Sequence, residues 1–236
     1  SKKQALDFNY KYAFALFATK KFKDARSRFN TIATSDSKYK EDALYYSGLS
    51  SYYLGDYNNA YKTFQKIEKA KKYDKIVPYY LASIQFINKD YKGVIAYAEP
   101  KLKENIKYTT EIAHLLGNSY YEMQQYDKAK YYLEEYMSKS VKATPEDYYI
   151  LGYVQAQEND CKNAVKNLEQ LSPLETELAQ NAMYQMAKCL IIIDKKNDAK
   201  NAFLQSARLD FNKTIKEESI FQYAKLSYEL NNINDA

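Results

Sequence analysis

Apolar residues recur at spacings of three and four along almost the whole chain, the pattern of helices that bury one face. Glycine occurs five times and proline four times among the 236 residues, so the connections between these helices are expected to be short. The pattern therefore predicts an all-α protein. No apolar run approaches the roughly 18 residues that a membrane-spanning helix needs, and we expect no membrane span in this segment.

The helical pattern also repeats. Three stretches share the same order of large, small and polar positions: LYYSGLSSYYLGDYNNAYKTF (44–64), AHLLGNSYYEMQQYDKAKYYL (113–133) and YYILGYVQAQENDCKNAVKNL (148–168). Their starts lie 69 and 35 residues apart, which gives a period near 35. A period of this length is typical of arrays in which each unit is a pair of helices.

Small residues mark one position in each helix of the pair. The first-helix position is Ala13, Gly48, Ala82, Gly117, Gly152, Ala187 and Ala224, and the second-helix position is Ala25, Ala60, Val94, Ala129, Ala164, Ala199 and Ala236. Two antiparallel helices cross closely where both side chains are small. Large residues four positions further on then fill the groove: Phe29, Phe64, Leu133, Leu168 and Phe203. We therefore expect Gly48, Gly117 and Gly152 to lie wedged between paired helices.

The chain resembles the tetratricopeptide repeat family over nearly its whole length. The motif of that family appears here as Leu44, Gly48, Tyr52, Ala60 and Phe64, and again as Leu116-Gly117, Tyr120 and Ala129. The resemblance implies a right-handed α-α superhelix of helix-turn-helix repeats, with an inner face made mainly by first helices. The expected single array, 1–236, comprises repeats at 6–39, 41–74, 75–108, 110–143, 145–178 and 180–213, and a partial repeat at 217–236.

Local features of individual repeats give further predictions. Pro100 stands inside the second helix of the third repeat, where it removes a donor and crowds the preceding turn, so we expect a kink or break near 98–100. Prolines that follow Thr or Ser are expected to open helices at 144–145 and 172–173. Residues 214–217 have the pattern of a capping box.

The resemblance also implies a concave groove, lined by three positions of each first helix. Counted so that the small residue of that helix is position eight, they are positions five, nine and twelve. Position five carries a ring in every unit: Tyr10, Tyr45, Tyr79, His114, Tyr149, Tyr184 and Phe221. The ligand-binding residues predicted for the groove are Tyr10, Phe14, Phe17, Tyr45, Leu49, Tyr52, Tyr79, Phe86, His114, Asn118, Tyr121, Tyr149, Tyr153, Tyr184 and Lys188. These rings have two compatible roles, support of neighbouring helices and a ladder for an extended peptide.

Position nine changes in character along the chain. It is apolar in the first two repeats, with Phe14 and Leu49, and basic in the last two, with Lys188 and Lys225. A ligand with a hydrophobic anchor and an acidic tail would match this polarity.

Composition argues against several classes of function. The basic residues behind the net charge of +5 are nearly all lysine, and only three arginines could bind phosphate bidentately, so no nucleic acid is expected as a partner. His114 is the one histidine and has no metal-binding companion at helical spacing. Cys161 and Cys189 show no CxxC spacing and are expected to be small buried residues, with a disulfide between them left open. We predict no enzyme activity, no cofactor and no metal site.

We expect a scaffold that binds a protein or peptide segment in this groove. The chain is rich in tyrosine, lysine and asparagine and has GDY turns. In these features it resembles bacterial cell-envelope repeat arrays, such as the tol-pal accessory protein and the outer-membrane-assembly lipoproteins. That likeness implies envelope assembly and a periplasmic or outer-membrane-associated location, with a cytoplasmic one left open. The alternatives are a glycan- or peptidoglycan-binding module and a regulatory or sensory repeat domain of a larger protein.

The last repeat ends where its second helix is expected to begin. We therefore expect an excerpt of a longer array, because solenoids end in capping units. The apolar face at 220–230 is then uncovered and offers a route to homo-oligomers.

Overall fold

The computed structural model describes residues 2–230, and within this range every regular element is a helix. In chain order the α-helices are α1 (Lys2–Ala18), α2 (Phe22–Ala33), α3 (Lys40–Tyr53), α4 (Tyr57–Gln65), α5 (Val77–Ile87), α6 (Tyr91–Lys101), α7 (Thr109–Glu122), α8 (Tyr126–Lys139), α9 (Pro145–Gln157), α10 (Cys161–Leu168), α11 (Glu177–Ile192), α12 (Lys196–Arg208) and α13 (Lys213–Glu229). A short 3-10 helix, Glu169–Leu171, follows α10. The all-α prediction is confirmed. The partial repeat predicted at 217–236 is described only as far as residue 230, so its small residue Ala236 lies outside the described residues.

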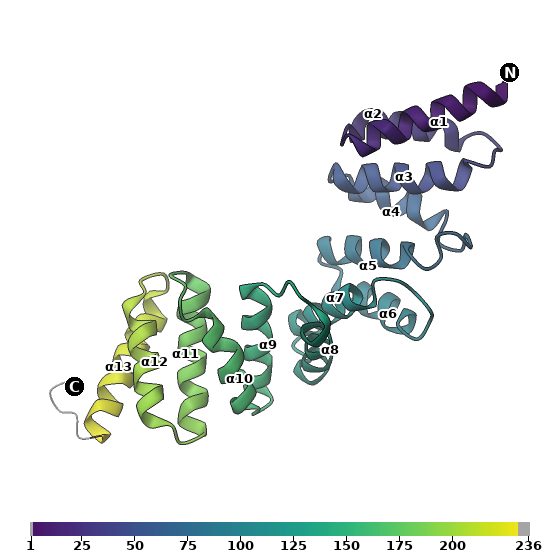
Figure 1. Cartoon of the computed structure of the whole chain (residues 1–236). Helices are drawn as coiled ribbons and strands as arrows, with labels where there is room; N and C mark the ends of the chain where they lie inside the picture. The colour runs from purple at the N-terminus through teal and green to yellow at the C-terminus, as the bar shows by residue number, and fades with distance from the viewer. Residues whose placement is uncertain (1, 231–236) are drawn as a thin grey trace. The chain divides into compact units, whose positions relative to one another are not determined.

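The chain divides into two compact units, residues 1–115 and 116–236, and the division falls within α7. In the first unit each helix from α1 to α5 packs against the next along the chain, and α1 also contacts α3 (Figure 1). The six helices are thus paired into three hairpins, and within the unit each hairpin rests on the one that follows it.

The second unit has the same order of packing from α8 to α13. First helices of successive hairpins also touch, because α9 contacts α11 and α11 contacts α13 (Figure 1). Stacking of this kind buries the apolar face that a lone hairpin would expose. No helix within residues 2–230 is both long enough and apolar enough to cross a membrane.

Glycine lies at the point of closest helix approach in three hairpins. A Cβ atom added to Gly48 would lie 2.8 Å from the ring of Phe64, and one added to Gly152 would lie 2.7 Å from Cγ of Leu168. The added atom at Gly117 would meet Leu133 at the same 2.7 Å. The prediction that these glycines are wedged between paired helices is confirmed.

The large residues that fill the hairpins are fully enclosed. Each of them is at most 1% exposed: Phe29, Phe64, Leu133, Leu168 and Phe203. Repeats that have alanine in place of the glycine bury it completely, as at Ala13, Ala82 and Ala187. A methyl group is therefore the largest side chain seen at this crossing in the first six repeats, and the core of each unit is built around it.

The structure corrects the prediction for the third repeat. Helix α6 continues through Pro100 and ends at Lys101, so the predicted break at 98–100 is wrong. The N–H of Leu102 still donates to the carbonyl oxygen of Ala98 over 3.3 Å. Because proline removes only one hydrogen bond, and does so one residue before the helix ends, the helix tolerates it there.

Helix starts follow side-chain caps more closely than prolines. Pro145 opens α9 as predicted, and Thr144 and Asp147 form a reciprocal capping box. Pro173 opens no helix, since α11 starts at Glu177 with Thr176 as its cap, and that prediction is wrong.

The capping box predicted at 214–217 is also wrong. Asn212 caps α13 instead, because its side-chain oxygen accepts from the N–H of Ile215 over 3.1 Å. This places the helix start at Lys213 and leaves Thr214 inside the first turn. Asn is as strong a cap as Thr or stronger, which explains why the earlier residue prevails.

We expect Gly152→Val to destabilise the second unit by about 2 kcal/mol, because the added methyl groups collide with Leu168 in a close-packed crossing. Urea unfolding followed by circular dichroism measures the loss. The partner substitution Leu168→Ala should cost less in the Gly152→Val background than in the wild type, since it vacates the space that valine needs. If the losses of unfolding free energy in the two single variants simply add in the double variant, Gly152 is not wedged against Leu168.

Candidate functional site

The rings predicted at position five are stacked on a second tyrosine rather than free. Tyr10 of α1 stacks on Tyr39, with ring centroids 4.2 Å apart and planes 14° apart. Tyr45 of α3 stacks on Tyr73 at 4.3 Å and 20°. Each second tyrosine lies just before the first helix of the next repeat, so one ring pair bridges successive hairpins.

The third repeat has a corresponding pair with tilted rings. Tyr79 of α5 lies 5.0 Å from Tyr108, which directly precedes α7, and the ring planes are 38° apart. The three bridging tyrosines, Tyr39, Tyr73 and Tyr108, recur at spacings of 34 and 35 residues, so the sequence carried a signal for them that the motif analysis missed. Aromatic pairs of this kind contribute about 0.5–1.5 kcal/mol beyond their burial. In the first unit these rings therefore hold the repeats together.

Asp42 of α3 accepts from the preceding repeat and from the end of its own repeat. The hydroxyl of Tyr73 donates to its Oδ1 over 2.8 Å, and the hydroxyl of Tyr10 donates to its Oδ2 over 3.3 Å. Lys72 forms an ion pair with the same carboxylate. Burial raises the pKa of both tyrosines above the usual range, and the carboxylate of Asp42 adds to the effect. Both hydroxyls thus stay protonated donors at neutral pH.

At position nine the first two repeats differ in accessibility. Phe14 is 42% exposed and meets the ring of Tyr46 edge-on at 5.2 Å. Leu49 is 5% exposed and belongs to the hydrophobic core of the first unit. A ligand on the first helices would therefore meet Phe14 and little of Leu49.

At position twelve the rings pack against the first residue of the following helix. Three edge-to-face pairs repeat this geometry at 5.5–5.6 Å: Phe17 with Phe22, Tyr52 with Tyr57, and Phe86 with Tyr91. The hydroxyl of Tyr52 also lies 2.8 Å from Oγ of Ser83. These rings fix the turn of each hairpin.

The predicted residues of the second unit include a tyrosine cluster on α7, α8 and α9. Tyr153 lies 5.9 Å from Tyr121, 6.0 Å from Tyr126 and 6.1 Å from Tyr149. All four rings are half-buried. Burial raises the pKa of Tyr149 to about 12, so its hydroxyl also remains protonated.

The remaining predicted residues lie on α7 and α11. His114 and Asn118 are half-buried on α7. Tyr184 on α11 meets Phe203 edge-on at 5.9 Å, and the ammonium of Lys188 lies 5.5 Å from the centre of the Tyr184 ring. Lys188 is exposed and keeps its charge at the surface.

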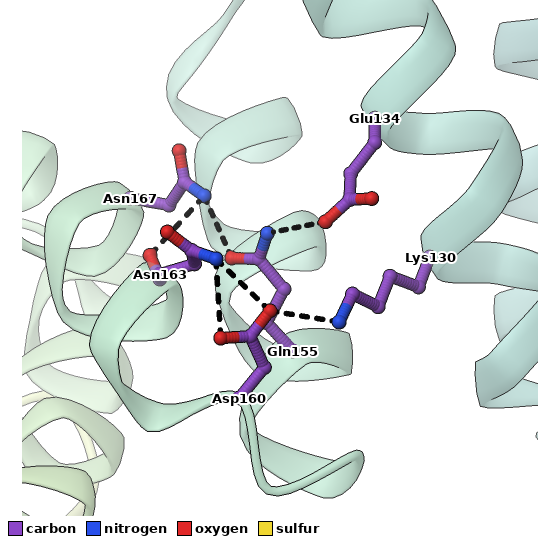
Figure 2. A network of polar contacts seen from close by, with 6 residues as sticks. All are labelled: Lys130, Glu134, Gln155, Asp160, Asn163 and Asn167. Carbon is purple, nitrogen blue, oxygen red and sulfur yellow. Dashed lines mark hydrogen bonds and ion pairs between the residues drawn. The ribbon is translucent and has the colours of Figure 1, made fainter.

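A polar network that the motif analysis missed joins α8 to α9 and α10 (Figure 2). Nζ of Lys130 lies 2.7 Å from Oδ2 of Asp160, and the amide of Asn163 donates to the same carboxylate at 3.0 Å. Beside it, Gln155 donates to Glu134 over 2.9 Å. Asn167 completes the network by donating to Gln155 over 2.8 Å.

The first unit contains the same clamp between its first two repeats. Nη1 of Arg26 lies 2.7 Å from Oδ2 of Asp56, and the amide of Asn59 donates to that oxygen over 2.8 Å. The Asn59 hydrogen bond, with Arg26 assisting, lowers the pKa of Asp56. We define the clamp as a basic residue one position after the small residue of a second helix, bound to the turn aspartate of the next repeat.

In the clamp of the second unit, Lys130 and Asp160 each stabilise the charged form of the other. Hydrogen bonds from Lys130 and then Asn163 lower the pKa of Asp160, and the bond to Asp160 raises the pKa of Lys130. Both side chains are about three-quarters buried, with 27% and 23% exposure. The geometry therefore favours the charged pair at neutral pH.

The two cysteines are free and buried, so the disulfide that the sequence left open is not formed. Burial, together with the neighbouring Cys161, raises the pKa of the Cys189 thiol to about 12. A protonated buried thiol is a poor nucleophile. Both residues act as small apolar groups in the core of the second unit.

We expect Lys130→Met to lower the free energy of unfolding by about 1 kcal/mol at neutral pH, because it removes the clamp cation. The pKa of Asp160 is lower in the folded than in the unfolded protein. The clamp therefore stabilises the fold fully above about pH 4, the unfolded pKa, and this stabilisation is lost as pH falls through the folded pKa. The difference from wild type should therefore shrink in acid. Lys162→Met, at an exposed lysine of α10, is the matched control. A difference that persists unchanged in acid would contradict the assignment.

We expect neither cysteine to react appreciably with iodoacetamide at pH 8 in the folded protein, because both side chains are buried and the raised pKa of Cys189 keeps that thiol protonated. In urea without reductant, both should be alkylated, which mass spectrometry detects as two added groups. Rapid labelling of the folded chain, or failure to label the unfolded chain, would overturn this picture.

Comparison with known proteins gives a match to the tetratricopeptide repeat model over residues 42–70 and 114–140, together less than half of the chain. These segments contain Gly48 and Gly117, two of the three wedged glycines. Comparison with curated proteins gave no match.

Solved structures share the fold. The crystal structure of YrrB, a TPR protein with an unusual peptide-binding site, is 20% identical, has a TM-score of 0.58 and aligns with 72% of this chain and 84% of its own. MamA from Desulfovibrio magneticus RS-1 is 18% identical, with a TM-score of 0.58 over 70% of this chain and 92% of MamA. A tetratricopeptide repeat protein from Parabacteroides merdae is 13% identical, with a TM-score of 0.55 over 93% and 99%. The two matched segments resemble the tetratricopeptide repeat, and the chain has the fold of solved tetratricopeptide repeat structures.

Proposed function

We propose that this chain is a protein-interaction scaffold whose first helices hold an extended segment of another protein. The observation that carries the proposal is the regular placement of half-buried rings on these helices, each already fixed by a neighbouring ring. Rings that are ordered before binding cost little entropy when a ligand contacts them. The fold supports this use, since stacked hairpins present long continuous surfaces.

The two units offer different chemistry to such a segment. The first unit presents Phe14 together with the half-buried rings of Tyr10 and Tyr45. The second unit adds the exposed ammonium groups of Lys188 and Lys225 on α11 and α13. Lysines at the surface steer and orient acidic partners more than they add affinity. We therefore propose apolar anchoring on the first unit and an acidic stretch on the second.

The proposed setting is assembly in the bacterial cell envelope, with the protein periplasmic or outer-membrane-associated. It rests on the likeness of sequence style to envelope repeat proteins. Fractionation of cells that express the complete gene, with periplasmic and cytoplasmic marker proteins, tests the location.

We expect a peptide selected from a random display library on the full chain to bind the first helices. Lys188→Glu should weaken binding of an acidic peptide about tenfold, because it replaces an attraction by a repulsion. Tyr153→Ala should weaken binding of the same peptide by removing a ring from the tyrosine cluster. Fluorescence polarisation measures the affinity.

The control for both variants is Val141→Ser, in the loop between α8 and α9, where the side chain is 95% exposed and is not among the residues predicted for the groove. Circular dichroism verifies that each variant is folded. Equal affinities for all variants would count against the proposal. So would binding of cell-wall glycan by a chain that selects no peptide from the library.

A further inference from the structure

A polar pocket in the first unit lies where the second helix of one repeat meets the turn of the next. It is lined by residues of α4 and by the end of α5 with its following turn: Asn58, Tyr61, Lys62, Gln85, Asn88 and Asp90. Tyr61 and Asp90 occupy the two clamp positions, since Tyr61 follows the small residue Ala60 and Asp90 is the turn aspartate. This is therefore the place that a clamp fills in other repeats.

Two other repeats show which group this place accommodates. The guanidinium of Arg26 lies there against Asp56, and the ammonium of Lys130 lies there against Asp160 (Figure 2). In the pocket the aspartate is retained and the basic residue is replaced by a tyrosine. The chain thus supplies the anion of the clamp without its cation.

The second donor of the clamp is missing as well. Asn59 and Asn163 donate side-chain hydrogen bonds to their turn aspartates, and Gly93 holds the equivalent position here. Among the described residues the carboxylate of Asp90 accepts a hydrogen bond only from the backbone N–H of Gly93, at 3.0 Å. Any Cβ at Gly93 would collide with Oδ2 of Asp90 and with the amide of Gln85. Glycine therefore keeps this carboxylate in place beside Gln85.

Gln85 and Tyr61 form the wall beside the Asp90 carboxylate. The side-chain amide of Gln85 lies next to Gly93. The ring of Tyr61, half-buried on the pocket wall, can also pack against a planar cation.

We propose that this pocket binds the guanidinium group of an arginine side chain on a partner protein. Arginine fits better than lysine because its planar fork can donate to both oxygens of the Asp90 carboxylate and stacks on aromatic faces. Lys62 on the rim adds a positive charge that weakens the attraction without filling the pocket. The site is separate from the residues proposed for the groove, so either proposal can fail alone.

The second unit provides an internal contrast. Its pocket between α10 and α12 includes Val165 and Lys195, which hold the clamp positions of the basic residue and the aspartate. Glu169 and Asp198 also line it, but the turn aspartate that a clamp guanidinium binds is replaced by a lysine. The arrangement of Asp90 with Tyr61 is therefore not repeated there.

The test is a titration of the full chain with N-acetyl-arginine amide, followed by amide chemical shifts. We expect saturable shifts at Gln85, Asp90 and Gly93, and no saturable shift at those amides with N-acetyl-citrulline amide, which has the same shape without the charge. Asp90→Asn should reduce the affinity at least tenfold while keeping the helix cap, because Asn caps as well as Asp. Shifts of equal size with citrulline, or none with arginine, would overturn the proposal.

Tyr61→Arg provides a second, independent readout. The new guanidinium should occupy the pocket as Arg26 does in the first repeat, which should raise the melting temperature and abolish arginine binding. Val165→Arg, the same substitution in a repeat whose turn aspartate is replaced by Lys195, should raise the melting temperature less. If Tyr61→Arg leaves arginine binding unchanged, the pocket is not the site.

Discussion

Close approach of two helices at a side chain no larger than methyl is the constraint on which this structure depends. At Gly48, Gly117 and Gly152 a single added carbon would overlap the large residue of the partner helix. The helices of each hairpin can come this near only because the crossing is small on both sides. Once the crossing is fixed, the apolar faces that remain must stack on the next hairpin, and an array follows.

The sequence was sufficient to predict this part of the fold because the constraint acts at one position per helix. A residue that must be small leaves a mark every 35 positions, whatever surrounds it. Helix ends were harder to predict because several residues compete for each cap. Thr176 and Asn212 prevailed over neighbouring candidates by side-chain hydrogen bonds that spacing alone does not rank.

The candidate site was predictable in its positions and less so in its surroundings. The tyrosines at position five lie on the first helices, but their bridging partners, such as Tyr39 and Tyr73, come from connections that the helical motif does not cover. The clamps were missed for a related reason. Lysine at a helix surface usually has water as its partner, and only the register of the neighbouring repeat shows that Lys130 reaches Asp160.

The helix crossing contributes most of the packing energy of a repeat, and the ion-pair clamp contributes little. This difference explains how the repeats can vary at the clamp without loss of the fold. A crossing contact is buried and close-packed, so a change there costs several times more than loss of a partly exposed ion pair. Clamp residues can therefore be replaced, as Arg26 is by Tyr61 and then by Ile95 in successive second helices, while the hairpins keep their packing. Where only the cation is lost, the anion remains fixed by the helix cap that it forms, as at Asp90. A surface group that stays ordered for structural reasons is already positioned for a partner, and this makes the outer edge of the hairpins, as well as the ring-bearing first helices, a place where recognition can arise at little cost in stability.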